Sequence, residues 1–223
     1  STDWNFVQYW VNQGYTEAGS HSRNHVHVPY TGTDPYNGRP RVSYEWQING
    51  SKNDILGNLT LPTWLRYDGK EYVYAWIEPF GSYDETVRQW LGQTRYLCDR
   101  GISSAIYDFA NWDPEKGLFQ RTGYTIEMGN TTQGSTSLSV LNGRFDFAYD
   151  SGKIYHLMTH PANVNWDIGS YADQHTSYIS NRTDVWYVPL GLLYLYRWVT
   201  VRNIVNITST GSGENKTFTL SIT

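Results

Sequence analysis

Strand-like and helix-like segments alternate along the first 200 residues, and this alternation restricts the fold more than any other sequence feature. Short runs rich in β-branched and aromatic residues predict strands, whereas longer runs behind a capping residue predict helices. Strands are expected at residues 15–21, 71–77, 102–109, 124–128, 153–159 and 184–188. Helices are expected at residues 4–12, 43–56, 82–99, 137–149, 167–180 and 190–199. This alternation is typical of an α/β domain with a mostly parallel sheet.

The helix expected at residues 82–99 contains Cys98, the only cysteine of the chain. Ser82 and Glu85 fit a capping box at its beginning, and Gly101 follows its expected end. With one cysteine no disulfide forms within the chain, so stability has to come from packing. A lone cysteine in a helix is more typical of a small buried apolar residue than of a nucleophile.

The last residues have a different pattern, in which apolar and polar residues alternate on both sides of a Gly-Ser-Gly turn. This pattern predicts a β-hairpin in residues 203–223. We therefore expect one main domain over residues 1–200 and a β-hairpin extension over residues 201–223. The hairpin is either an addition to the domain or the beginning of a further β domain.

The composition favours an exported protein that meets sugars. Aromatic residues make up 16% of the chain and charged residues only 17%, although an aromatic-rich core explains the first number equally well. A net charge of -4 without clustered Lys and Arg argues against nucleic acid. No apolar run is long enough for a membrane span. The chain begins at Ser1 rather than Met, so we expect that upstream residues were removed. Six Asn-X-Ser/Thr sequons predict glycosylation outside the cell, at Asn49, Asn58, Asn130, Asn181, Asn206 and Asn215.

Histidines gather in two places. His21, His25 and His27 lie within seven residues, at the carboxyl end of the first expected strand. Neutral imidazoles are good zinc ligands, so His21 and His25 are candidates to hold one divalent ion, most plausibly zinc; a loop with surface histidines is the alternative. His156 and His160 flank another expected strand end. His160 lies nearer the rim, where it serves either as a general acid or as a structural histidine.

The order of five segments resembles the polysaccharide deacetylase family, the fourth carbohydrate esterase family. The first segment ends in His21-Ser22-Arg23-Asn24-His25, which resembles the family's His-Thr-x-x-His. The resemblance covers roughly residues 3–200. The other four segments are 77–83 with Glu-Pro-Phe-Gly, 106–113 with Asp-Phe-Ala-Asn-Trp-Asp, 154–160 ending in Leu-Met-Thr-His, and the closing strand at 184–188.

The resemblance implies a distorted (β/α) barrel of seven or eight strands, and metal-dependent removal of acetyl groups from an extracellular polysaccharide. It implies that His21 and His25 bind the metal and that His160 protonates the departing amine. The main-chain amides of Phe80 and Gly81 would face the oxyanion. The residues implied to bind substrate are Pro79, Phe80, Gly81, Asp108 and Trp112.

Two features depart from the family pattern. Nothing in the chain matches the first strand, Thr-Phe-Asp-Asp-Gly, which supplies the base and the third metal ligand. Ile77 stands where the family has the arginine that orients the base. Three readings follow: a deacetylase whose first strand lies upstream, a non-catalytic relative that binds glycans in a cell-surface or extracellular assembly with other chains, or an unrelated α/β carbohydrate-binding protein.

Overall fold

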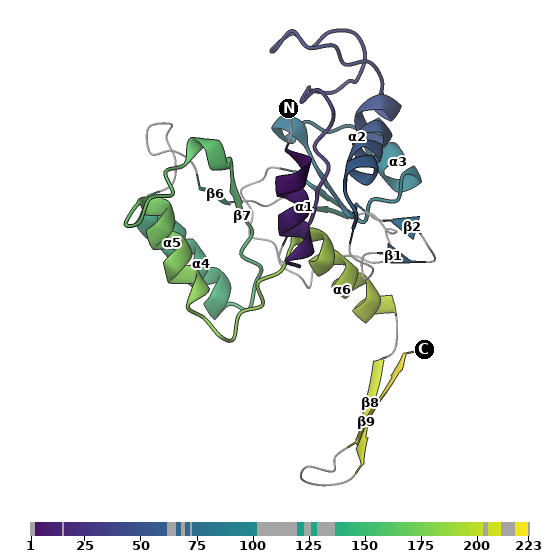
Figure 1. Cartoon of the computed structure of the whole chain (residues 1–223). Helices are drawn as coiled ribbons and strands as arrows, with labels where there is room; N and C mark the ends of the chain where they lie inside the picture. The colour runs from purple at the N-terminus through teal and green to yellow at the C-terminus, as the bar shows by residue number, and fades with distance from the viewer. Residues whose placement is uncertain are drawn as a thin grey trace.

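The structure is a computed structural model of the 223-residue chain, and Figure 1 shows its elements. It describes residues 3–14, 16–61, 66–67, 70–71, 73–101, 120–122, 126–128, 137–202, 205–210 and 217–222. The helices are α1 (Trp4–Asn12), α2 (Tyr44–Asn58), α3 (Glu85–Gln93), α4 (Leu138–Asp150), α5 (Tyr171–Ser180) and α6 (Leu190–Arg202), with 3-10 turns η2 (Pro79–Gly81) and η6 (Pro161–Asn163). The strands are β1 (Arg66–Tyr67), β2 (Lys70–Glu71), β3 (Ala75–Ile77), β4 (Cys98–Arg100), β5 (Gln120–Thr122), β6 (Ile126–Met128), β7 (Leu157–Thr159), β8 (Val205–Thr210) and β9 (Thr217–Ile222).

Parallel pairing dominates the interior strands, as the alternation predicted. β3, β4 and β5 form a three-stranded parallel sheet, and β6 pairs with β7 in parallel. Ser20 adds a parallel bridge to Trp76 on the outer side of β3. Within the described part of the chain the strands form separate small sheets and no closed barrel. The strand expected at residues 102–109 lies outside the described residues, so the barrel stays a prediction.

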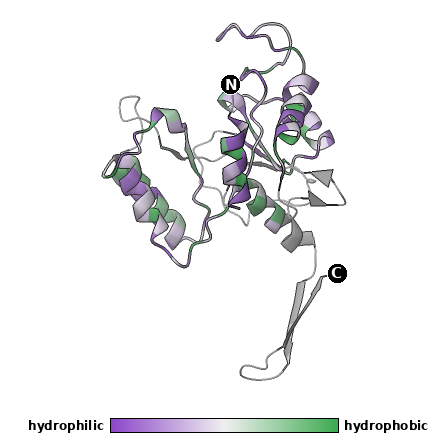
Figure 2. Ribbon diagram, in the orientation of Figure 1, coloured by the Kyte–Doolittle hydropathy of each residue, from purple (hydrophilic) through white to green (hydrophobic). Residues whose placement is uncertain are grey.

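Helices cover both faces of β3. The Trp76 side chain is fully buried in a cluster with residues of α1, α2 and α3, among them Ile48 and Leu91. Ala75 packs on the other face against Tyr194 of α6. Successive side chains of a strand point to opposite faces, so the sheet is buried on both sides, as parallel sheets usually are. Figure 2 shows the hydrophobic colouring of the first turns of α6, which cover this second face.

A second, smaller cluster joins α4, α5, β6 and β7, which lie together on one side of α1 in Figure 1. Its buried members are Met128 of β6, Leu141 of α4, Ala172 of α5 and Val164. Ser137 and Ser170 cap the two helices, and each side chain accepts a hydrogen bond from the main-chain amide three residues on. Each cap satisfies an amide that has no partner within its helix. The predicted helix at residues 137–149 is confirmed, whereas the one at 167–180 begins only at residue 171.

The helix expected at residues 82–99 is wrong at both ends. Asp84, not Ser82, caps α3 by accepting a hydrogen bond from the Val87 amide. The helix ends at Gln93, because Arg95 adopts a left-handed conformation with φ of 63°. The chain then enters the sheet, so Cys98 is a buried residue of β4 rather than of a helix. Burial raises the pKa of the Cys98 thiol, which agrees with the expected apolar role.

Several expected strands are shorter than predicted or absent. Residues 184–188 form no strand, and the Tyr187 hydroxyl donates to the main-chain carbonyls of Ile179 and Arg182. The expected strand at 153–159 is reduced to β7, and the one at 71–77 is divided between β2 and β3. Of the strand expected at 15–21, the described part contributes only the Ser20 bridge. In each of these segments few main-chain N–H and C=O groups pair with a neighbouring strand. The periodicity of the sequence does not predict such pairing.

The predicted C-terminal hairpin is confirmed. β8 and β9 pair antiparallel from Val205 with Ile222 to Thr210 with Thr217, and they extend away from the other elements in Figure 1. The preceding helix, α6, continues to Arg202. Among the described residues, no helix has the length and apolar character needed to cross a membrane.

Candidate active site

The carboxyl ends of the parallel strands carry two predicted site residues, His21 and His160, and two that were not predicted, Glu78 and Arg100. His21 follows the Ser20 bridge, Glu78 follows β3, and Arg100 is the last residue of β4. His160 directly follows β7 and begins η6. Functional sites of parallel α/β sheets gather at this edge because the loops that leave the strands converge there. The four residues come from four separate parts of the sequence.

His21 is held in a defined orientation by the neighbouring strand. Its Nδ1 lies 2.8 Å from the main-chain oxygen of Ile77. A carbonyl oxygen only accepts, so Nδ1 carries the proton and the lone pair is on Nε2. Burial lowers the pKa of His21 to about 4, with smaller contributions from His25, Arg100 and His160. The imidazole is therefore neutral at neutral pH, with one nitrogen open to a ligand.

His25 and His160 belong to the same cluster. The rings of His21 and His25 are 4.8 Å apart between centroids. Burial lowers the pKa of His25, and the neighbouring charges of Arg39 and His160 lower it further. His160 lies within electrostatic range of both His21 and His25. The structure brings the three predicted histidines together, whereas His156 lies at the opposite end of β7.

The loop between His21 and His25 has a strained main chain that buried polar contacts hold. Ser22 and His25 have φ angles of 63° and 52°, which non-glycine residues rarely adopt. The side-chain Oε1 of Gln47 accepts hydrogen bonds from the amides of Arg23 and Asn24, each at 3.1 Å. Gln47 is fully buried in α2. Because Gln47 of α2 holds the main chain of this loop, the positions of His21 and His25 are fixed.

Gly50 of α2 allows the Arg23 side chain of this loop to lie against the helix. A Cβ at Gly50 would be 2.6 Å from Nη1 of Arg23. The Arg23 guanidinium pairs with both carboxylate oxygens of Asp54 at 2.6 Å and lies 4.8 Å from the Trp46 ring centroid. The glycine inside the helix therefore serves close packing.

We expect Gly50→Ala to change the free energy of unfolding by less than about 1 kcal/mol. The better helix propensity of alanine, about 1 kcal/mol, is offset by displacement of Arg23 from its partly exposed ion pair and ring contact. In an Arg23→Ala background the same substitution should stabilise by about 1 kcal/mol, because nothing is displaced. Urea unfolding of the four proteins measures both values. Equal effects in the two backgrounds would contradict the packing role of Gly50.

A row of five rings runs from the histidine pair to the surface. Phe80 lies 4.2 Å from His25 and is stacked on His27, with centroids 3.9 Å apart and planes 5° apart. Tyr36 contacts the His27 ring at 4.6 Å. Together with the His21–His25 contact, these pairs form what we call the ring row. Phe80 is 46% exposed and Tyr36 is 79% exposed, so the row opens toward solvent at its outer end.

A buried carboxylate orients His27 within the ring row. Oδ2 of Asp34 accepts from the His27 amide at 2.5 Å and lies 3.0 Å from Nδ1 of the same residue. Its other oxygen accepts from the Tyr36 amide. These hydrogen bonds hold the pKa of Asp34 well below its usual range although burial opposes them, so the group is a carboxylate and His27 Nδ1 donates to it.

The structure describes some of the predicted substrate-binding residues and not others. Pro79 is buried, and Phe80 points to the histidines as described. The Gly81 amide donates to the main-chain oxygen of Glu78, at 3.2 Å, so any oxyanion contact of this turn rests on the Phe80 amide. Asp108 and Trp112 lie outside the described residues.

His21 and His25 fit a metal ion in part. A metal-bound histidine usually donates its other N–H to a carbonyl or carboxylate, and His21 has that contact with Ile77. Both imidazoles have lowered pKa values, which favours the neutral form that a metal needs. A structural or catalytic zinc site needs at least three protein ligands. The described residues contain no group of three or more His, Cys, Asp or Glu side chains placed to hold one ion.

The predicted glycosylation sites differ in accessibility. Asn58 and Asn181 are exposed and lie at the ends of α2 and α5. Asn49 is half-buried within α2, where a helical main chain is unlike the surface loops that carry such glycans. Asn206 lies in β8. Asn130 and Asn215 lie outside the described residues.

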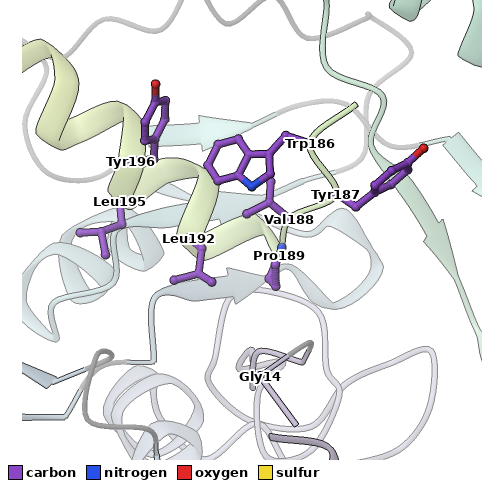
Figure 3. Close-up of a pocket in the computed structure, with 8 residues that line it drawn as sticks. All are labelled: Gly14, Trp186, Tyr187, Val188, Pro189, Leu192, Leu195 and Tyr196. Carbon is purple, nitrogen blue, oxygen red and sulfur yellow. The ribbon is translucent and has the colours of Figure 1, made fainter. Parts of the chain in front are cut away.

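A separate hollow lies between the loop before α6 and Gly14 at the end of α1, as Figure 3 shows. Its volume is about 490 Å³, and Trp186 and Tyr196 are more than half exposed in it, with ring centroids 5.0 Å apart. A neighbouring hollow is lined by Glu17, which lies at the N-terminus of α6. We call the first of these the aromatic hollow. None of the histidines lines it.

Sequence reasoning missed Gln47, Asp34 and Tyr36. Asp34-Pro35-Tyr36-Asn37-Gly38 has the Asx-turn pattern, in which an aspartate side chain accepts a hydrogen bond from the amide two residues on, and this pattern is a local signal for Asp34. Gln47 has no such local signal. Its partners Arg23 and Asn24 lie 24 and 23 positions earlier, and Arg41 lies 6 positions earlier.

Searches of family models, curated proteins and solved structures find no match to this chain.

Proposed function

We propose that this chain is a hydrolase domain of the polysaccharide deacetylase type, which removes acetyl groups from a glycan outside the cell or at its surface. The observation that carries the proposal is the convergence of His21, His25 and His160 from distant parts of the sequence. Exposed sequons at Asn58 and Asn181 support the extracellular location. The fold proposed for the whole domain is the distorted (β/α) barrel.

In the proposed reaction, water adds to the acetyl carbonyl carbon and gives up its two protons to solvent, and the C–N bond breaks. The electron pair of that bond stays on nitrogen, and His160 gives this nitrogen a proton, so that acetate and a free amine result. His21 and His25 would hold a divalent ion, most plausibly zinc. Such an ion supplies Lewis acidity toward the acyl oxygen when it is bound. The Phe80 amide would donate to the same oxygen.

A second candidate is a non-catalytic glycan-binding domain within a surface assembly. One observation favours it: the described residues hold two metal donors but no group of three. Glycan binding needs neither a third ligand nor a catalytic base. The ring row serves this function as well as it serves catalysis.

Two measurements on the full chain separate the candidates. Zinc titration should show one ion bound by the wild type and at least tenfold weaker uptake by the His21→Ala, His25→Ala double variant. Acetate release from acetylated chito-oligosaccharides should fall by about 100-fold or more in His160→Ala, the usual contribution of a general acid.

His156→Ala is the matched control, since this histidine lies at the other end of β7. It should keep both zinc uptake and activity. Equal and negligible zinc uptake by wild type and double variant would remove the metal site. Glycan binding without acetate release would select the non-catalytic candidate.

A further inference from the structure

The loop at residues 33–40 is fastened to the histidine loop by three hydrogen bonds. Asn37 Nδ2 donates to the main-chain oxygen of His25 at 2.8 Å. Arg39 Nη1 donates to the oxygen of Asn24 at 3.0 Å, and Asn24 Nδ2 donates to Pro40 at 2.6 Å. The two loops therefore form one unit, and the position of Tyr36 is coupled to that of His25.

Tyr36 is at the outer end of this unit, and most of its side chain is exposed to solvent. It is 79% exposed, while its main chain is fixed by the buried carboxylate of Asp34 and by the Thr33–Pro40 bridge. The Tyr36 ring is therefore presented to solvent from a fixed turn, where a ligand can stack on it. Its rigidity lowers the entropy lost when a ligand binds.

The chemistry of the ring row fits a sugar chain. Apolar C–H faces of pyranose rings pack on aromatic rings, and hydroxyl groups bond to the polar edges of tyrosine and histidine. The row is continuous from the proposed reaction site at His21 and His25 to Tyr36. A ligand that reaches from one end to the other is longer than one sugar unit.

We propose that Tyr36 is the outer wall of a glycan-binding subsite that extends from the histidine pair along His27 and Phe80, so that the domain recognises a polymer rather than a single acetylated sugar. This inference rests on the proposed function for the position of the reacting unit. The binding subsite itself does not require catalysis.

Binding is measured by calorimetry on the full chain, with a hexamer and a monomer of N-acetylglucosamine as probes and with a chelator present so that no acetyl group is removed. The wild type should bind the hexamer at least tenfold more tightly than the monomer. Tyr36→Ala should weaken hexamer binding about tenfold, the loss expected for one aromatic stacking contact, and should leave monomer binding unchanged. Tyr36→Phe should stay within about twofold of wild type.

Tyr196→Ala is the matched control, because this tyrosine is also an exposed aromatic residue, at 51%, but lies in the aromatic hollow. It should bind the hexamer as the wild type does. Loss of binding in Tyr196→Ala but not in Tyr36→Ala would overturn the proposal and assign the glycan to the aromatic hollow. Equal hexamer binding by wild type and Tyr36→Ala, or no hexamer binding at all, would also overturn it. Hexamer binding that depends on Tyr36 without acetate release in zinc would instead reject the hydrolase and keep the subsite.

Discussion

Gln47→Leu should lower the free energy of unfolding by roughly 3–5 kcal/mol and disorganise the histidine loop. The side chain accepts from the amides of Arg23 and Asn24, and its Nε2 donates to the main-chain oxygen of Arg41 at 2.8 Å. Leucine has a similar size but leaves these three main-chain groups without their partner. Each buried group left unsatisfied costs about 1–3 kcal/mol. Urea unfolding followed by tryptophan fluorescence measures the loss.

The matched control is Gln93→Leu, since Gln93 is an exposed residue at the end of α3. It should change stability by less than about 0.5 kcal/mol. The imidazole resonances of His21 and His25 report on the loop itself, and they should move in Gln47→Leu but not in Gln93→Leu. A Gln47→Leu protein with wild-type stability and unmoved histidine resonances would show that the loop holds its own strained conformation.

Local signals in the sequence predicted the elements that depend on local contacts. The cap residues Asp3, Ser43 and Ser137 each precede a helix that begins where expected, because the cap and the amides it satisfies are three residues or fewer apart. The Gly-Ser-Gly turn predicted the hairpin for the same reason. The end of α3 was not predictable in this way, since Arg95 adopts its left-handed conformation where the chain turns to pair β4 with a strand more than 20 residues earlier.

The histidines of the site were predictable and their support was not. The spacing of His21 and His25 and the position of His160 at a strand end indicated a common site, and the structure places the three side chains within electrostatic range of one another. The contacts that hold the loop from His21 to His25 come from Gln47, whose role depends on how α2 folds against that loop. Residue type alone carries no information about such tertiary contacts.

Glu17 is a further residue whose role depends on a tertiary contact, and it makes the stability of the chain depend on pH. Its Oε2 accepts from the Gly191 amide at 2.8 Å, so it caps the N-terminus of α6 from a position more than 170 residues earlier. A Cβ at Gly191 would lie 1.9 Å from Oε1, which explains the glycine. Burial raises the pKa of Glu17 to about 7, although the amides of Gly191 and Leu192 lower it. Desolvation therefore outweighs the favourable helix terminus.

Because the folded-state pKa lies above the ordinary value of 4.5, the folded chain binds more protons than the unfolded chain between pH 4.5 and about 7. The contribution of Glu17 to stability is therefore fully present below pH 4.5 and is lost as the pH rises to about 7. Glu17→Gln keeps an acceptor for Gly191 and removes the charge. We expect it to match the wild type near pH 4 and to be more stable by about 3 kcal/mol at pH 8, at 1.36 kcal/mol per pKa unit.

Urea unfolding of both proteins from pH 4 to pH 8 tests this expectation, and Glu45→Gln is the matched control. Glu45 is an exposed glutamate in the first turn of α2. Like Glu17, it lies at the N-terminus of a helix, but unlike Glu17 it is not buried. Its replacement should leave the pH dependence of the wild type unchanged. If Glu17→Gln is instead less stable than the wild type at pH 8, the carboxylate contributes more to the α6 terminus than its burial costs. That result would mean that the folded state stabilises the ionised carboxylate of Glu17 rather than its protonated form.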